Sequence, residues 1–145
     1  KFIKTMSFII LKGHIGLQMN FHHMMSQYKD IDIISKVEGA SKYDFIKIVL
    51  EELYVNLHIL ADAIKTKSKT SPEKSKSFAK SLTSLMILMD SLDFKKGEPI
   101  ASNLFNLYDY CRRSVIDDYR KLETDGIISS ANVIADILSG WKEIK

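Results

Sequence analysis

The stretch that decides the fold is residues 91–113, SLDFKKGEPIASNLFNLYDYCRR. It begins at the end of one helical pattern, passes through a turn that contains Gly97 and Pro99, and starts a second helical pattern at once. The apolar side chains of the second pattern recur at steps of three, four or seven residues: Ile100, Leu104, Leu107, Cys111, Val115 and Leu122. This spacing predicts two amphipathic helices that a short turn folds against each other.

Outward from this stretch, the same spacing predicts a first helix over residues 41–63, a second that opens at Ser71 and Pro72, and a fourth capped by Thr124 or Asp125. Their predicted core seams are Ile46, Leu50, Leu53, Leu57, Leu60 and Ile64; Phe78, Leu82, Leu85, Met89 and Leu92; and Ile127, Ala131, Ile134, Leu138 and Trp141. Four such helices with short connections can bury their seams only against each other. The sequence therefore predicts an all-α fold, an antiparallel up-down four-helix bundle.

The N-terminal part of the chain has a different character. Residues 25–40 show no sustained period and are expected to form an N-terminal arm or short helix. We expect residues 1–24 to be an N-terminal extension of unknown role and residues 25–145 to be the bundle domain. The apolar run MSFIIL is far shorter than the roughly 20 residues that span a bilayer, so no membrane span is expected.

The composition suits a protein of the reducing cytosol. Cys111 is the only cysteine, which excludes an internal disulfide and a thiolate-rich zinc site. The formal net charge is only +3, so nucleic-acid binding would need a local basic patch. One group of lysines surrounds a Ser/Thr-rich linker: Lys65, Lys67, Lys69, Lys74, Lys76 and Lys80. No arginine stands among them, so a solvated loop is favoured and no nucleic-acid partner is expected.

Few residues are suited to catalysis, and we expect no enzyme activity, no metal and no cofactor. A di-iron bundle needs Glu-x-x-His pairs, and no histidine of this chain follows a glutamate by three positions. The adjacent His22 and His23 diverge from each other and are expected to be surface residues. Cys111 lies on a helix seam, which is typical of core packing. His58 lies about 130° from the seam of its helix and should be exposed, so a histidine phosphotransfer bundle is the alternative function.

The first and third helices carry more apolar residues than one core stripe needs. The surplus predicts either a groove for an amphipathic partner segment or a surface for self-association. A wide core face covered by the N-terminal arm accounts for the surplus equally well. By stripe geometry, the predicted groove residues are Phe45, Ile48, Val49 and Ile59 on the first helix and Phe105, Tyr108, Ile116 and Tyr119 on the third.

Residues 92–113 also resemble a motif of the flagellar secretion chaperone family FliS. The motif has Leu-Asp, a short charged turn, Gly-Gly, and a helix reading Ile-Ala-x-Asn-Leu-x-x-Leu-Tyr-x-Tyr before a double arginine. The matching residues are Leu92, Asp93, Gly97, Ile100, Ala101, Asn103, Leu104, Leu107, Tyr108, Tyr110, Arg112 and Arg113. The resemblance extends over about residues 24–144 and includes Ala40, Ser41, Phe45, Ile46 and Trp141. This chain departs from the pattern at Lys42, Glu98 and Pro99.

The resemblance implies a cytoplasmic, non-enzymatic chaperone with a four-helix bundle. Its implied partner is the disordered C-terminal segment of flagellin, which would lie in the apolar groove and be kept from premature polymerisation until secretion. Components of the flagellar export apparatus are further expected partners. The resemblance also implies an N-terminal cap, Met25 and Tyr28 here, that gives way to flagellin. We expect Asn103 and Asp109 to make helix-surface or loop-anchoring hydrogen bonds.

Overall fold

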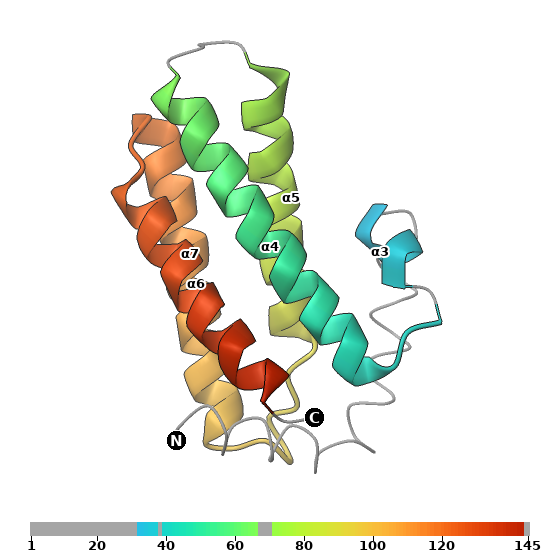
Figure 1. The fold of residues 1–145 in the computed structure, drawn as a ribbon. Coiled ribbons are helices and arrows are strands. Elements are labelled where there is room, and N and C mark those ends of the chain that lie inside the picture. Colours follow the sequence, from blue (N-terminus) through green and yellow to red (C-terminus); the bar gives the residue numbers. More distant parts are fainter. Residues whose placement is uncertain (1–31, 38, 67–70, 144–145) are drawn as a thin grey trace.

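The computed structural model describes residues 32–37, 39–66 and 71–143, which form helices with short connections (Figure 1). The helices are α3 (Asp32–Val37), α4 (Lys42–Lys65), α5 (Pro72–Asp90), α6 (Ile100–Lys121) and α7 (Asp125–Lys142). No strand occurs among the described residues. The predicted all-α four-helix bundle is therefore confirmed.

The four long helices form a closed ring in chain order. α4 contacts α5 and α7, and α6 contacts the same two helices, so α4 and α6 occupy opposite corners. In Figure 1, α4 and α7 lie in the front layer and α5 and α6 behind them, with the α5–α6 and α6–α7 turns at opposite ends. Over the described part of the chain, no helix is both long and apolar enough to cross a membrane.

The core follows the predicted seams of α4, α6 and α7 in most positions. Leu50, Leu53, Leu57 and Leu60 of α4 are completely buried. The prediction for Leu122 is wrong, because this residue lies just past the end of α6 in the left-handed conformation (φ 57°) and is 54% exposed. α6 ends at Lys121, and the left-handed backbone of the next residue turns the Leu122 side chain away from the buried face of the helix.

The predicted seam of α5 is correct at Leu85 and Leu92, which are buried, and wrong at Phe78, Leu82 and Met89. Small side chains, rather than Phe78 and Leu82, occupy the centre of the buried face: Ser77, Ser81, Ser84 and Ser91. Phe78 and Leu82 are half-buried at the flank. Hydrophobicity alone cannot identify this face, because a row of serines reads as polar although it lets two helices pack closely.

The helix starts agree with the predicted cap positions but not always with the predicted chemistry. Ser41 Oγ accepts the N–H of Asp44 (3.2 Å), as expected for an N-cap. Ser71 and Thr124 occupy the N-cap positions of α5 and α7, yet neither side chain makes a cap hydrogen bond. For α7 the carboxylate of Asp118, on α6, accepts the N–H groups of the first turn instead.

The short helix α3 packs against the bundle. Ile33 and Ile34 are buried in the common core cluster. Lys36 Nζ lies 2.9 Å from Glu52 Oε1 on α4, which ties the two helices at the surface. The expectation of a short helix within residues 25–40 is confirmed for the described residues, and the division of the chain at residue 24 lies outside them.

Candidate partner-binding surface

The eight predicted groove residues lie on two helices that do not adjoin. α5 and α7 separate α4 from α6, so the two sets of four cannot line one groove between neighbouring helices. The α4 set is Phe45, Ile48, Val49 and Ile59, and the α6 set is Phe105, Tyr108, Ile116 and Tyr119. Any partner that meets both sets must cross α5 or α7.

Three of the eight residues belong to the hydrophobic core. Phe45 and Val49 are completely buried, and Tyr108 is 3% exposed. Burial, with a smaller effect from Cys111, raises the pKa of Tyr108 well above its usual value, so its hydroxyl stays neutral. These three side chains support the surface from beneath and could meet a partner only if the core opened.

The α6 set continues across the neighbouring helix α5. Phe78 of α5 stacks on Tyr119 of α6, with ring centroids 3.7 Å apart and an interplanar angle of 5°. At the other end, Phe94 meets Phe105 edge-on, with centroids 5.8 Å apart. One ring pair joins α5 to the end of α6, and the other joins the α5–α6 turn to the start of α6. The 14 residues from Phe105 to Tyr119 correspond to about 21 Å of helix.

Between the two ring pairs, the α5 side is apolar, whereas the α6 side also carries the Asp109–Arg112 ion pair. Leu82, Met89 and Ile116 are half-buried, and Met86 is 42% exposed. On α5 the four apolar residues lie within about 80° of helix surface, and on α6 Phe105, Ile116 and Tyr119 lie within about 60°. We call this surface the α5–α6 strip: Phe78, Leu82, Met86, Met89, Phe94, Phe105, Ile116 and Tyr119.

Sequence reasoning found the α6 half of this strip and missed the α5 half. The spacing of Phe78, Leu82 and Met89 matches a buried stripe and therefore predicts core residues. The signal that could have placed them is the row Ser77, Ser81, Ser84 and Ser91, which has the same helical spacing and turns the larger side chains outward. Phe94 follows the last turn of α5, where no helical period applies.

A carboxylate between two arginines lies on the outer side of α6, and Asp109 and Arg112 share the helix face of the strip's α6 residues. Asp109 accepts hydrogen bonds from Arg112 (Nη2–Oδ1 2.7 Å) and Arg113 (Nε–Oδ2 3.0 Å). The hydrogen bond from Arg112 is the largest cause that holds the pKa of Asp109 below its usual value. The expectation that Asp109 makes helix-surface hydrogen bonds is confirmed.

The turn between α5 and α6 has a defined shape. Asp93 Oδ1 accepts the N–H groups of Lys95 (2.9 Å) and Lys96 (3.1 Å). A β-carbon at Gly97 would lie 2.6 Å from the Asp93 carbonyl oxygen, so only glycine fits there. Glu98 accepts the N–H and hydroxyl of Ser102. This departure from the family motif therefore caps α6, which Pro99 at the N-cap position cannot do.

A second apolar surface lies on the outside of α4. Ile48 and Ile59 are half-buried and Val55 is 50% exposed, and all three lie within about 40° of one another around the helix. We call this surface the α4 stripe. It has fewer apolar side chains than the α5–α6 strip, and none of them is aromatic.

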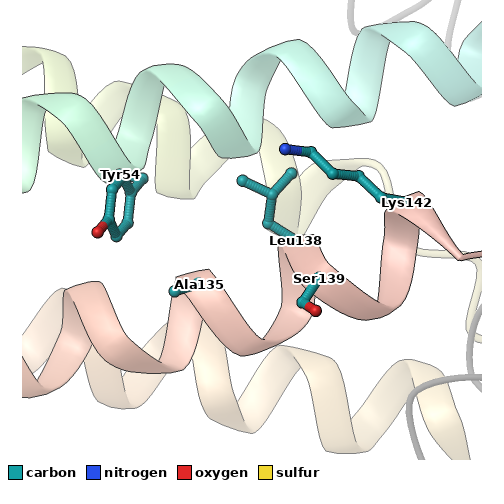
Figure 2. A pocket seen from close by; sticks show the side chains of 5 residues that line it. All are labelled: Tyr54, Ala135, Leu138, Ser139 and Lys142. Carbon is teal, nitrogen blue, oxygen red and sulfur yellow. The ribbon is translucent and has the colours of Figure 1, made fainter.

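A small hollow lies between α4 and α7. Its volume is about 210 Å³, and Figure 2 shows Tyr54 of α4 and Leu138 and Lys142 of α7 pointing into the space between the helices. Ala135 and Ser139 complete the lining. A hollow of this size holds one large side chain rather than a length of helix.

The described residues offer little for catalysis. Burial raises the pKa of the Cys111 thiol to about 11, so this side chain is a core residue and a poor nucleophile. His58 is exposed, as predicted, and its ring packs edge-on against Tyr54 with centroids 4.6 Å apart. In residues 32–37, 39–66 and 71–143, no group of three or more His, Cys, Asp or Glu side chains could hold a metal ion.

Several predicted features lie outside the described residues. They are the proposed cap residues Met25 and Tyr28, the pair His22 and His23, and Lys67 and Lys69 of the lysine cluster. Within the described part of that cluster, Lys74 is buried and so does not belong to a solvated face.

Comparison with known proteins adds an independent finding. The family model described as flagellar protein FliS matches residues 24–145. A curated relative, the flagellar secretion chaperone FliSB of Pseudomonas aeruginosa, is 25% identical over 121 residues, which cover 83% of this chain and 94% of the relative.

Proposed function

Because this chain belongs to the FliS family of flagellar proteins, we propose that it binds the C-terminal segment of flagellin on the α5–α6 strip. At the level of the family it is a flagellar export chaperone. The finer proposal is that the client is flagellin, that binding prevents premature polymerisation, and that this takes place in the cytoplasm before secretion. The exposed strip is the single observation that carries the proposal.

The strip has the size and chemistry of a site for a short amphipathic helix. Its length of about 21 Å matches about four turns of helix. Helices this short are marginal in water, so a disordered segment would become helical only on binding. Ordering it costs about 1–2 kcal/mol per residue for the backbone, which contact with several aromatic and Met side chains can offset.

The α4 stripe offers a second contact for a longer segment. Ile48, Val55 and Ile59 lie on the opposite corner of the ring from α6, so one straight helix cannot cover both surfaces. We propose that the segment bends around the bundle and uses the α5–α6 strip first, because the strip presents more apolar and aromatic surface. Self-association through the strip is the competing use of the same surface.

Calorimetry with the C-terminal segment of flagellin from the same organism tests the proposal. We expect heat of binding and a one-to-one complex on a sizing column. Absence of both heat and complex would contradict the proposal, and a chain that elutes as a dimer without the segment would favour self-association.

Met86→Gln tests the location of the site. Met86 is 42% exposed, so the substitution should change the free energy of unfolding by less than about 0.5 kcal/mol. Loss of its apolar contact should weaken flagellin binding about three- to ten-fold by calorimetry. Tyr110→Gln is the matched control, because Tyr110 is 41% exposed but faces Ser129 of α7. Equal effects of the two variants would place the site elsewhere.

A further inference from the structure

A polar group lies in the middle of the α5–α6 strip. Arg112 is seven residues from Phe105 and seven from Tyr119, so it lies about 10 Å along α6 from each of them. Its direction around the helix falls between those of the two aromatic residues. The side chain of Arg112 is 36% exposed, whereas that of Arg113, about 100° further around the helix, is 67% exposed. A segment that covers the strip therefore covers Arg112 as well.

The guanidinium of Arg112 is only partly paired. Its Nε and Nη2 atoms both donate to Asp109 Oδ1, at 3.1 Å and 2.7 Å. A guanidinium has five N–H groups, so the two on Nη1 and the second one on Nη2 have no partner among the residues that the structure describes. These N–H groups depend on solvent. A partner that displaced the solvent would have to supply an acceptor in its place, because a covered and unpaired donor is costly.

The facing helix α5 supplies no charged acceptor for these N–H groups. The aromatic contacts between the two sides of the strip lie on both sides of Arg112, so the α5 residues near it come from the second half of that helix. Residues 81–89 contain no charged side chain, and those that belong to the strip are apolar. Asp109 is thus the one carboxylate that Arg112 contacts in the described part of the chain.

The charges around Arg112 do not cancel. Asp109 is ionised, because the hydrogen bond from Arg112 holds its pKa below the usual value. With Arg112 and Arg113 it forms a group of three side chains that carries one positive charge. Asp117, the next carboxylate after Asp109 along α6, is paired with its own cation, Lys121 (3.1 Å). A carboxylate is therefore favoured over a neutral acceptor at Arg112, since charge-assisted hydrogen bonds are stronger.

We propose that Arg112 binds a carboxylate in the middle of the flagellin segment and so fixes the register of that segment on the strip. This inference rests on the proposed function and adds the chemistry of the partner. The segment carries one Asp or Glu on its apolar face, with apolar residues about seven positions before and after it that contact the Phe105 and Tyr119 ends. A polar pair within an apolar contact specifies register, because a shifted segment leaves both groups covered and unpaired.

A double-mutant cycle measured by calorimetry tests the inference. Arg112→Met keeps the apolar stem of the side chain and removes the guanidinium, so we expect it to lower the affinity for the flagellin segment about three- to thirty-fold. Each acidic residue of the segment is also replaced in turn by alanine. One of these replacements should weaken binding to the wild type and have little further effect on binding to Arg112→Met, which is the result for two groups in direct contact.

The matched control is Arg113→Met, which removes the same charge from the same carboxylate at a more exposed position. We expect it to bind the segment within about two-fold of the wild type and to show no coupling with any acidic residue. Circular dichroism of both variants checks that they are folded. Equal weakening by the two variants, or the absence of a coupled acidic residue, would overturn the inference while the proposed function stands. No binding of the segment to the wild type would overturn both.

Discussion

Ser81 is a buried polar residue whose hydroxyl has no hydrogen-bond partner among the described residues. Leaving a buried hydroxyl unpaired costs about 1–3 kcal/mol, and serine is also a weaker helix former than alanine. We expect Ser81→Ala to raise the free energy of unfolding by about 0.5–1.5 kcal/mol in urea titrations followed by circular dichroism.

Ser77→Ala is the control for this prediction. Ser77 lies on the same face of α5 and is also buried, but its hydroxyl donates to the Glu73 carbonyl oxygen (2.7 Å). Its removal should give less stabilisation than Ser81→Ala, because a formed hydrogen bond is lost. If Ser77→Ala stabilised the protein as much as Ser81→Ala did, the absence of a partner at Ser81 would not be the cause.

Cys111 gives the protein a defined pH dependence. Burial raises the pKa of its thiol from 9.0 to about 11, against a smaller lowering by its contact with the Ser130 carbonyl oxygen. Well below pH 9 the thiol is protonated in both states, so its ionisation does not change the free energy of unfolding. Above pH 9 the unfolded chain loses the proton first, so this contribution falls as the pH rises towards 11.

We therefore expect the free energy of unfolding to fall by about 1 kcal/mol more in the wild type than in Cys111→Ala between pH 8 and pH 10. Urea titrations at fixed pH values measure this difference. Parallel pH curves for the two proteins would show that the thiol ionises equally easily in the folded and unfolded states.

At the scale of the helix, α7 depends on a side chain of α6 for its start. Asp118 Oδ2 accepts the N–H groups of Gly126 (2.6 Å) and Ile127 (3.0 Å), whereas Thr124 makes no side-chain cap. A β-carbon at Gly126 would lie 3.0 Å from the same oxygen, so glycine allows the close approach. A negative charge at this helix start also interacts favourably with the helix dipole.

Asp118→Ala should lower the free energy of unfolding by about 1.5–3 kcal/mol, because one buried and one partly buried N–H group lose a charged partner. Asp117→Ala, at an exposed residue of the same turn, should cost less than about 0.5 kcal/mol. Chemical unfolding of both variants measures the contrast. Equal losses would mean that the carboxylate of Asp118 does not stabilise α7.

The helices themselves differ in how far their faces could be predicted. In α4, leucines and isoleucines recur every three or four residues, and this spacing predicted the buried face correctly. The large apolar side chains at these positions are the ones that pack in the core. In α5, Leu85, Ile87 and Leu88 are completely buried, whereas Phe78, Leu82 and Met89 lie at the flank because serines take part of the buried face. The spacing of apolar residues in the sequence shows where they lie around a helix. Which of them are buried also depends on how closely the neighbouring helices pack.

At the scale of the whole molecule, Tyr43 and Trp141 close the ring of helices. The Tyr43 hydroxyl donates to the Trp141 carbonyl oxygen (2.7 Å), and Trp141 Nε1 donates to the Tyr43 carbonyl oxygen (3.1 Å). The two rings stack with centroids 5.7 Å apart. This pair joins the first turn of α4 to the last turn of α7, 98 residues later in the chain.

Tyr43→Phe removes one of these hydrogen bonds and should lower the free energy of unfolding by about 0.5–1.5 kcal/mol. Trp141 is the only tryptophan, so its fluorescence reports directly on this junction during urea unfolding. Tyr110→Phe is the control, because its hydroxyl makes an exposed contact with Ser129 (3.2 Å) and its loss should be nearly neutral. Similar effects of the two variants would argue against a special role for the junction.

The sequence by itself determined the helices, their order and the family motif around residues 92–113, because these depend on local spacing and local turn chemistry. It also identified Phe105, Ile116 and Tyr119 as apolar residues outside the seam of α6. Only the tertiary structure decided that Phe45, Val49 and Tyr108 are core, that Phe78 and Leu82 are half-buried at the flank of α5, and that α5 lies between the two sets of predicted residues. The physical reason is that sequence spacing gives only the direction of each side chain around its own helix. Whether that side chain is exposed depends on which neighbouring helix packs on that side.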